Sequence, residues 1–190
     1  MNICVYGASS NVIANTYIEA GEALGLAMAK RGHKLVFGGG ASGMMGAAAR
    51  GMTKGGGEII GVAPRFFDVD GVLYPNCTEF IFTETMRERK SIMEEKADAF
   101  IMTPGGIGTF EEFYEILTLR QLGRHQKAIG ILNVDDYYRP LIQMQEQAIE
   151  LNFMRPECAD LCGWFEQIDP LLDYLEQAVE ATSAKEMKYI

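Results

Sequence analysis

The chain has 190 residues, of which 48% are hydrophobic and 23% charged, a composition that excludes a disordered, collagen-like or coiled-coil protein. This length predicts a single domain over residues 1–190. The formal net charge of −9 disfavours binding to nucleic acid through its phosphates, and no apolar segment approaches the roughly 18 residues of a membrane span.

The amino terminus and the cysteines indicate the cellular compartment. No basic stretch precedes the first apolar run, so we interpret residues 2–6 as a strand and not as a signal peptide. The four cysteines are too few and too scattered for a disulfide framework. Cys158 and Cys162 lie four residues apart, but no second Cys or His pair accompanies them, so we expect no metal ion. We therefore predict a reduced, cytoplasmic protein.

Strands and helices are predicted to alternate along the chain. Apolar runs predict strands at residues 2–6, 34–37, 59–63, 80–83, 99–103 and 128–132. Helical spacing and turn residues predict helices at residues 16–31, 42–54, 85–96, 109–122, 137–151 and 170–181, with a frayed tail at 182–190. Apolar strands alternating with helices are typical of an α/β, Rossmann-like fold, a doubly wound parallel sheet flanked by helices on both faces.

Glycine-rich turns follow three of the predicted strands. They lie at Gly7, at residues 38–40 and at residues 104–108. In a doubly wound sheet ligands bind beyond the carboxyl ends of the strands, so these turns are the predicted binding site. A fourth cluster, residues 55–57, follows a helix, and we interpret it as a helix C-cap without a ligand role.

The turn at residues 104–109 leads from a strand directly into a helix. Glycines let a backbone approach an anion closely, and a helix start offers free N–H groups, so a phosphate is one predicted occupant. The alternative is a tight turn in which Thr109 and Glu112 form a capping box. A dinucleotide-binding G-x-G-x-x-G spacing does not occur here and no Walker lysine follows, so neither a nicotinamide oxidoreductase nor ATP hydrolysis is favoured.

Helical phase distinguishes the two adjacent glutamates of this helix. Glu112 shares a stripe with Ile116 and Leu119, so it is predicted to lean toward the apolar side. Glu111 is predicted to face water. A partly desolvated carboxylate beside a binding site is a candidate catalytic group.

Two cations share a helical stripe with two methionines in the preceding helix. Met86, Arg89, Lys90 and Met93 recur at the spacing of one helix face. A buried carboxylate or phosphate partner would explain this mixture. The alternative is that the Arg89 and Lys90 stems lie over the core while their charges reach water.

The remaining polar and aromatic residues argue against other chemistry. His33 and His125 are the only histidines, and both are predicted to lie at the surface, which leaves Ser-His-Asp or Cys-His catalysis without its base. Trp164 is predicted to pack against the C-terminal helix.

Three segments together resemble the LOG ("Lonely guy") family, the cytokinin riboside 5′-monophosphate phosphoribohydrolases that are often mislabelled lysine decarboxylases. These segments are residues 38–46, 86–90 and 104–112, and the family pattern P-G-G-x-G-T-x-x-E is met in full, ending at Glu112. The resemblance runs from the first strand to about Asn152. Nothing suggests a pyridoxal phosphate site, and we predict no cofactor. The departures are Ala128, where a proline is frequent, and Leu119, where an aromatic residue is common.

The resemblance implies that the chain cleaves the N-glycosidic bond of a purine nucleoside 5′-monophosphate. Arg89 and Glu112 match the family's essential pair. The positions that match its nucleotide contacts are Gly7, Ser9, Gly39, Gly40, Gly43, Met44, Met86, Lys90, Gly105, Gly106, Gly108 and Thr109. The resemblance also implies a homodimer or a higher oligomer, with the site near the subunit interface. Arg87, Leu119 and residues 66–73 are candidates for selecting the base.

Residues and resemblance agree on a hypothesis for the mechanism. The helix start at residues 105–109 holds the 5′-phosphate, while Glu112 stabilises positive charge on the ribose, orients its hydroxyls or activates water. Arg89 keeps Glu112 ionised and in place, or contacts the nucleotide. The alternatives are a nucleotide sensor that uses the same site without catalysis, and a purely structural oligomer component.

Overall fold

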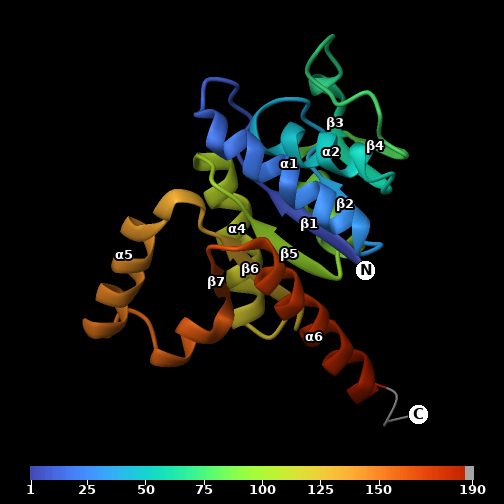
Figure 1. Ribbon diagram of the computed structural model, residues 1–190. Helices are drawn as coiled ribbons and strands as arrows, with labels where there is room; N and C mark the ends of the chain where they lie inside the picture. Colours follow the sequence, from blue (N-terminus) through green and yellow to red (C-terminus); the bar gives the residue numbers. More distant parts are fainter. Residues whose placement is uncertain (187–190) are drawn as a thin grey trace.

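The computed structural model describes residues 1–186, in which seven strands form one parallel sheet (Figure 1). The sheet order is β4-β3-β2-β1-β5-β6-β7. The strands are β1 (Asn2–Tyr6), β2 (Lys34–Phe37), β3 (Ile59–Pro64), β4 (Glu79–Thr83), β5 (Ala99–Met102), β6 (Ala128–Leu132) and β7 (Gly163–Phe165). The chain runs outward from β1 to β4 and then returns to the other side of β1 as β5. This reversal confirms the predicted doubly wound fold.

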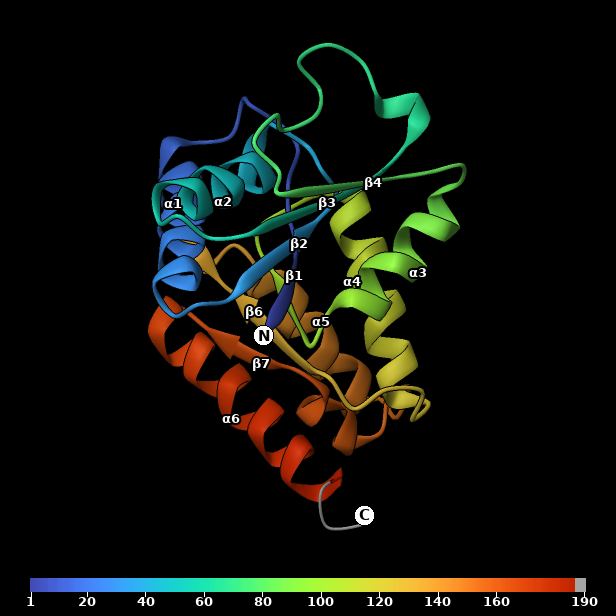
Figure 2. The same ribbon diagram turned by 90° about the vertical axis from the view of Figure 1, so that its right-hand side faces the viewer.

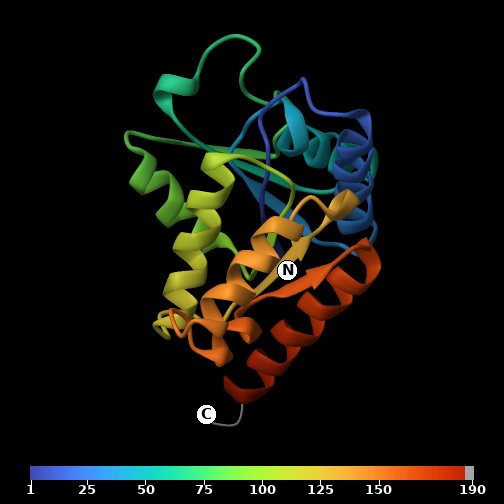
Figure 3. The same ribbon diagram turned by 90° about the vertical axis from the view of Figure 1, so that its left-hand side faces the viewer.

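Helices cover both faces of the sheet (Figures 2 and 3). One face carries α1 (Asn15–Lys30), α2 (Gly43–Lys54) and α6 (Ile168–Glu186), and the other carries α3 (Met86–Lys96), α4 (Ile107–Gln121) and α5 (Arg139–Glu150). The side chains of the strands alternate between these layers, as the pleat requires. In β1, Ile3 and Val5 face the α1–α2 layer, whereas Cys4 and Tyr6 face the α3–α4 layer.

The register of the sheet brings the ends of three strands to one edge. Val5 of β1 is paired with Phe37 of β2 on one side and with Ile101 of β5 on the other. The glycine-rich turns after these strands therefore meet at the top of Figure 1, at the point where the strand order reverses. A backbone hydrogen bond of 3.0 Å from Ala8 N–H to the Pro104 carbonyl joins two of them.

Several predictions about the C-terminal third are corrected by the structure. The short strand β7 was not predicted, because its three residues carry too little of a strand pattern. Trp164 lies on β7 and packs against Tyr138, in the core on the face opposite α6, so its predicted contact with the C-terminal helix is wrong. The predicted fraying at 182–190 is wrong for 182–186, which continue α6, while 187–190 lie outside the described residues.

Both histidines are buried, which contradicts their predicted surface positions. His33 Nε2 lies 2.8 Å from a Glu176 carboxylate oxygen of α6, and His125 Nε2 lies 2.9 Å from the Ile116 carbonyl of α4. Desolvation by burial lowers the pKa of both imidazoles. Each histidine ties a loop to a helix, and neither belongs to the cavity described below.

Candidate active site

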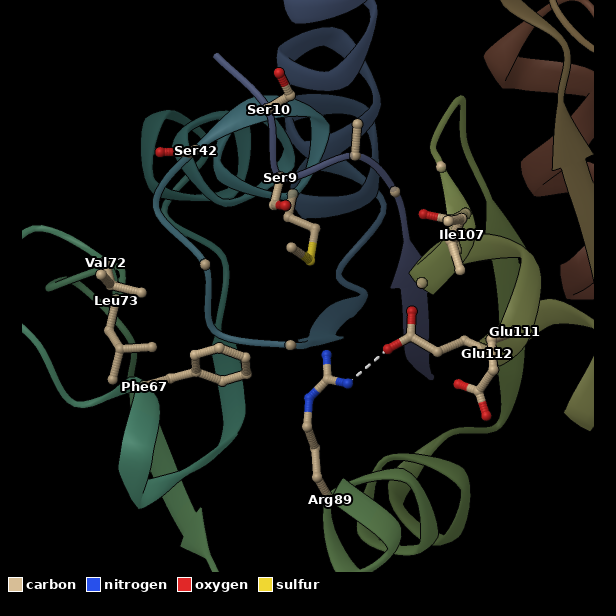
Figure 4. Close-up of a pocket in the computed structure, with 18 of the residues that line it drawn as sticks. Ser9, Ser10, Ser42, Phe67, Val72, Leu73, Arg89, Ile107, Glu111 and Glu112 are labelled. Carbon is tan, nitrogen blue, oxygen red and sulfur yellow. Dashed lines mark hydrogen bonds and ion pairs between the residues drawn. The ribbon is translucent and has the colours of Figure 1, made fainter. Parts of the chain in front are cut away.

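A cavity of about 620 Å³ lies beyond the carboxyl ends of the strands (Figure 4). Its walls come from the loops after β1, β2, β3 and β5 and from the first turns of α3 and α4. The lining residues are Gly7, Ala8, Ser9, Ser10, Gly38, Gly40, Ser42, Met45, Phe67, Gly71, Val72, Leu73, Met86, Arg89, Gly106, Ile107, Gly108, Thr109, Glu111 and Glu112. The cavity is of a size that suits a small-molecule ligand.

Arg89 and Glu112 form a buried ion pair at the floor of the cavity. Arg89 Nη1 donates a hydrogen bond of 2.6 Å to Glu112 Oε1, and Arg89 Nε donates to the Val62 carbonyl at 3.2 Å. Their side chains expose only 7% and 9% of their surface. The predicted mixed stripe on α3 is thereby explained, since the buried anion facing Arg89 is a carboxylate.

The Glu112 carboxyl combines burial with a nearby cation. Desolvation raises the pKa of Glu112 above its usual value, and Arg89 offsets part of that rise. Only one carboxylate oxygen is engaged by Arg89, while the other points away from it (Figure 4). A carboxylate held at one oxygen and accessible at the other can act on a ligand in the cavity.

Gly38 makes room for the Arg89 guanidinium. A Cβ atom at this position would lie 2.0 Å from Arg89 Nη2, much closer than atoms can approach. The glycine that follows β2 therefore supports the ion pair by leaving room for Arg89, although it carries no charge itself. Gly38 belongs to the glycine-rich turn at residues 38–40 that was predicted as part of the binding site, but no role for it beside Arg89 was predicted, because Gly38 and Arg89 are distant in sequence.

The N-terminus of α4 opens onto the cavity. The helix begins at Ile107 with Gly106 as its N-cap, and no side chain of the described residues caps it. The backbone N–H groups of Ile107, Gly108 and Thr109 have no acceptor within residues 1–186. The alternative of a capping box formed by Thr109 and Glu112 is therefore wrong, because the helix starts two residues before Thr109. Free amides and the positive end of a helix dipole are features that favour binding of an anion.

The N-terminus of α2 is filled by the protein itself. Gly43 N–H donates to Asn11 Oδ1 at 3.1 Å, and Met45 N–H donates to the Ala8 carbonyl at 3.2 Å. Gly43 adopts a φ of 60°, and a Cβ there would lie 2.4 Å from the Ala8 carbonyl oxygen. The loop after β1 thus packs directly onto this helix start.

The structure divides the predicted contact residues into two groups. Those that line the cavity beside Arg89 and Glu112 are Gly7, Ser9, Gly40, Met86, Gly106, Gly108 and Thr109. Those outside the lining are Gly39, Gly43, Met44, Lys90 and Gly105. Lys90 instead binds Glu111 and Glu115 of α4. The predicted phase of the two glutamates is confirmed, because Glu112 is buried and Glu111 is exposed.

An apolar wall faces the α4 terminus across the cavity. Phe67, Val72 and Leu73 come from the loop after β3, within the segment predicted to select the base, whereas Arg87 and Leu119 are outside the lining. Backbone hydrogen bonds tie this loop to the turn after β2, from Ala41 N–H to the Val72 carbonyl and from Tyr74 N–H to the Gly39 carbonyl. Sequence alone could not place the wall, because the loop has no periodic pattern.

The described part of the chain contains neither a metal cluster nor a membrane span. No group of three or more His, Cys, Asp or Glu side chains within residues 1–186 could hold a metal ion. In the same residues no helix is both long and apolar enough to cross a membrane.

The chain is similar to known proteins both in sequence and in fold. The family described as "Possible lysine decarboxylase" matches residues 45–175. The probable cytokinin riboside 5′-monophosphate phosphoribohydrolase LOGL3 of Oryza sativa subsp. japonica is 37% identical over 93% of this chain and 83% of its own length. The cytokinin riboside 5′-monophosphate phosphoribohydrolase LOG2 of Arabidopsis thaliana is 36% identical over 93% and 83%.

Solved structures share the fold at lower identity. The molybdenum cofactor binding protein of Rippkaea orientalis superposes with a TM-score of 0.71 at 20% identity, covering 94% of this chain and 96% of that one. The Moco carrier protein of Chlamydomonas reinhardtii gives a TM-score of 0.71 at 20% identity over 95% and 98%. At this identity the likeness concerns the fold alone. The sequence matches over most of the chain show that it belongs to the LOG family, whose relatives are named cytokinin riboside 5′-monophosphate phosphoribohydrolases.

Proposed function

We propose that this protein hydrolyses the N-glycosidic bond of N6-modified adenosine 5′-monophosphates and releases the free base and ribose 5-phosphate. The observation that carries the proposal is one juxtaposition. A buried carboxylate, paired with a guanidinium, lies in the same cavity as an uncapped helix N-terminus. The first can act on a sugar and the second can hold its phosphate. The names of the sequence relatives support the same activity.

The 5′-phosphate is assigned to the N-terminus of α4. Among the residues that the structure describes, three backbone N–H groups lack an acceptor there, and Gly106 and Gly108 have open space where a Cβ would stand. A phosphate can therefore approach the backbone closely and accept several hydrogen bonds, with the helix dipole adding to the attraction. Ser9, across the cavity, offers a further hydroxyl (Figure 4).

The ribose then lies against the Glu112 carboxylate. Cleavage of the bond between C1′ and the base builds positive charge on the sugar ring. An ionised Glu112 stabilises that charge, orients the ribose hydroxyls or activates the attacking water, and a buried site strengthens each of these effects. The water supplies the hydroxyl that ends on C1′, and the base leaves with a proton.

Arg89 positions this carboxylate and favours its charged form. Arg89 Nε donates a hydrogen bond to the Val62 carbonyl, and Nη2 occupies the space that a side chain at Gly38 would fill. Nη1 therefore reaches Glu112 in one defined direction. Arg89 is unsuited to donating a proton, because guanidinium groups do not lose theirs near neutral pH.

The base is assigned to the apolar wall formed by Phe67, Val72 and Leu73. An aromatic ring and two aliphatic side chains favour a flat base with an apolar substituent over a charged one. This assignment supports an N6-modified adenine. The homodimer implied by the family resemblance stays a prediction.

Product analysis tests the proposal. Purified protein is incubated without added metal, separately with AMP and with isopentenyladenosine monophosphate, and free base is measured by chromatography. We expect release from both, with the isopentenyl nucleotide preferred. Nucleotide binding by calorimetry without any base release would refute the hydrolase and favour a sensor.

A further inference from the structure

Two tyrosines from the connection between β6 and α5 hold the turn that precedes α4. Tyr137 donates a hydrogen bond from its hydroxyl to the Gly105 carbonyl at 2.7 Å, and Tyr138 donates one to the Thr103 carbonyl, also at 2.7 Å. Neither tyrosine lines the cavity. Both therefore hold the backbone of this turn from outside the cavity.

The hydrogen bond from Tyr137 fixes the peptide group between Gly105 and Gly106. This peptide is trans, as is every peptide bond of the described residues, so its C=O and N–H groups point in opposite directions. A carbonyl held toward Tyr137 turns the Gly106 N–H away from that side chain. Gly106 lines the cavity, whereas Gly105 and Tyr137 do not, so this N–H is left on the cavity side of the turn.

The direction of this peptide decides what the turn offers to an anion. Within residues 1–186 the Gly106 N–H has no acceptor, like the three N–H groups that follow it. Glycine stands on both sides of the peptide, and a glycine backbone rotates more freely than any other. Half a turn of the peptide would bring the Gly105 carbonyl oxygen to the place of the N–H. Successive N–H groups attract an anion, and an oxygen among them repels it.

The ring of Tyr137 is held on two sides by other aromatic rings. Its centroid lies 6.0 Å from that of Tyr17 of α1 and 4.9 Å from that of Tyr138, with interplanar angles of 77° and 80°. The Tyr137 backbone N–H donates to the Val134 carbonyl at 3.0 Å. The hydroxyl therefore reaches the Gly105 carbonyl from a defined direction.

The loop that carries the two tyrosines has an unusual backbone. Asp135 and Asp136 adopt φ angles of 49° and 56°, in the left-handed region that residues other than glycine rarely enter. The buried Asn133 side chain supports this conformation, because it accepts a hydrogen bond from Tyr138 N–H at 2.8 Å and donates one to the Asp136 carboxylate at 3.2 Å. Strained residues that the surroundings hold in place are typical of segments that position functional groups.

We propose that Tyr137 is a positioning residue that holds the peptide between Gly105 and Gly106 with its N–H facing the cavity, so that this amide joins the α4 terminus in binding the substrate phosphate. The inference rests on the proposed function and goes beyond it, because it gives a side chain outside the cavity a role in phosphate binding.

Tyr138 provides a comparison within the same turn. Its acceptor, the Thr103 carbonyl, belongs to the peptide that joins Thr103 to Pro104, and proline has no backbone N–H. This hydrogen bond therefore orients no N–H group toward a ligand. Tyr138 and Thr103 are both buried, so the bond is expected to contribute to folding stability.

Three variants, each lacking one hydroxyl, test the inference by calorimetry with AMP and with adenosine, which differ only in the phosphate. Tyr137→Phe keeps the ring and its contacts. We expect its Kd for AMP to rise about threefold to tenfold, the range of one ordinary hydrogen bond, with the Kd for adenosine within about twofold of the parent. The KM for AMP should rise in parallel, with kcat changed by less than about twofold.

The other two variants are controls for the hydroxyl and for the turn. Tyr17→Phe removes a hydroxyl that has no hydrogen-bond partner within residues 1–186 and keeps the ring that packs against Tyr137, so both Kd values should stay at the parental level. Tyr138→Phe should lower the melting temperature more than Tyr137→Phe does, without a selective loss of AMP affinity.

The outcomes separate a role in positioning from a role in folding. Parental AMP affinity in Tyr137→Phe would overturn the inference, and so would an equal loss for AMP and adenosine. The same selective loss in Tyr138→Phe would also overturn it, because a general loosening of the turn would then explain the effect. If the parent binds AMP but releases no base, the proposed function fails, and the Kd values still decide the inference. If the parent binds AMP no more tightly than adenosine, both are refuted.

Discussion

Two connections in this molecule start from the same kind of sequence and end differently. Both β2–α2 and β5–α4 run from a buried strand through glycines into a helix. At α2, the chain's own oxygens accept hydrogen bonds from Gly43 and Met45. At α4, the N–H groups of residues 107–109 find no acceptor in the described part of the chain. A glycine-rich turn before a helix is therefore insufficient to make an anion site.

The loop after β1 lies between the two helix starts and accounts for the difference. Toward α2 it presents acceptors, the Ala8 carbonyl and the Asn11 side chain. Toward the β5–α4 turn it presents a donor, the Ala8 N–H, which binds the Pro104 carbonyl. Because helix N-termini need acceptors, the loop satisfies one terminus and leaves the other open. The α2 connection is therefore closed by the chain itself, whereas the α4 connection is the one proposed to bind the phosphate.

The largest expected effect is a loss of catalytic rate when the buried glutamate of α4 is changed. Glu112→Gln should lower kcat by about 10²-fold to 10⁴-fold, since the carboxylate charge is lost while an acceptor for Arg89 remains. Turnover of AMP and thermal unfolding are measured together. Glu115→Gln, on the same helix but outside the cavity, is the control. Near-parental turnover of a folded Glu112→Gln variant would refute the assignment.

The next largest effect is a loss of folding stability when Gly43, at the start of α2, is changed. Gly43→Ala introduces a side chain at a φ of 60° and against the Ala8 carbonyl, so we expect a loss of about 2–3 kcal/mol in the free energy of unfolding. Urea denaturation measures it. Gly56→Ala, also at positive φ but with open space around its Cβ, is the control and should cost less. Equal losses would show that the contact with Ala8 is unimportant.

A smaller effect is expected from Gly38, which belongs to the β2–α2 connection but contacts Arg89, the ion-pair partner of Glu112 on α4. Gly38→Ala places a Cβ where Arg89 Nη2 stands, and the flexible guanidinium can move aside. We therefore expect about a tenfold loss of kcat/KM, with little change in thermal stability. Steady-state kinetics and a melting curve distinguish this from a folding defect. Unchanged kinetics would mean that the Arg89 position is not needed for turnover.

The smallest expected effect has opposite signs for stability and binding. Gly108 lies in the first turn of α4, and beyond its chain neighbours and the helix's own backbone no atom of the described residues would lie within 4 Å of an added Cβ, so Gly108→Ala should stabilise the fold through helix propensity by about 0.5–1 kcal/mol. Gly108 lines the cavity, so the added methyl group should raise the KM for AMP severalfold by keeping the phosphate from the backbone. Improved binding in this variant would contradict the phosphate assignment at α4.

The positions of strands and most helices could be predicted because local patterns determine them. The strands at residues 2–6, 34–37 and 128–132 match the structure at both ends, since continuous apolar runs bounded by turn residues leave little choice. The phase of Glu111 and Glu112 followed from the helical repeat. The start of α4 was misplaced by two residues, because Thr109 and Glu112 fit a capping pattern that the structure instead uses at Thr85 and Glu88.

The sequence by itself determined the fold class, the family and the residues that carry charge into the cavity, because periodicity and motifs are local properties of the chain. Only the tertiary structure decided which helix terminus stays open, how Arg89 reaches Glu112 and why Lys90 turns to Glu111. It also decided the burial of His33 and His125. Each of these depends on contacts between segments distant in sequence or on neighbouring loops, whose donors and acceptors meet only when the sheet has brought the strand ends together.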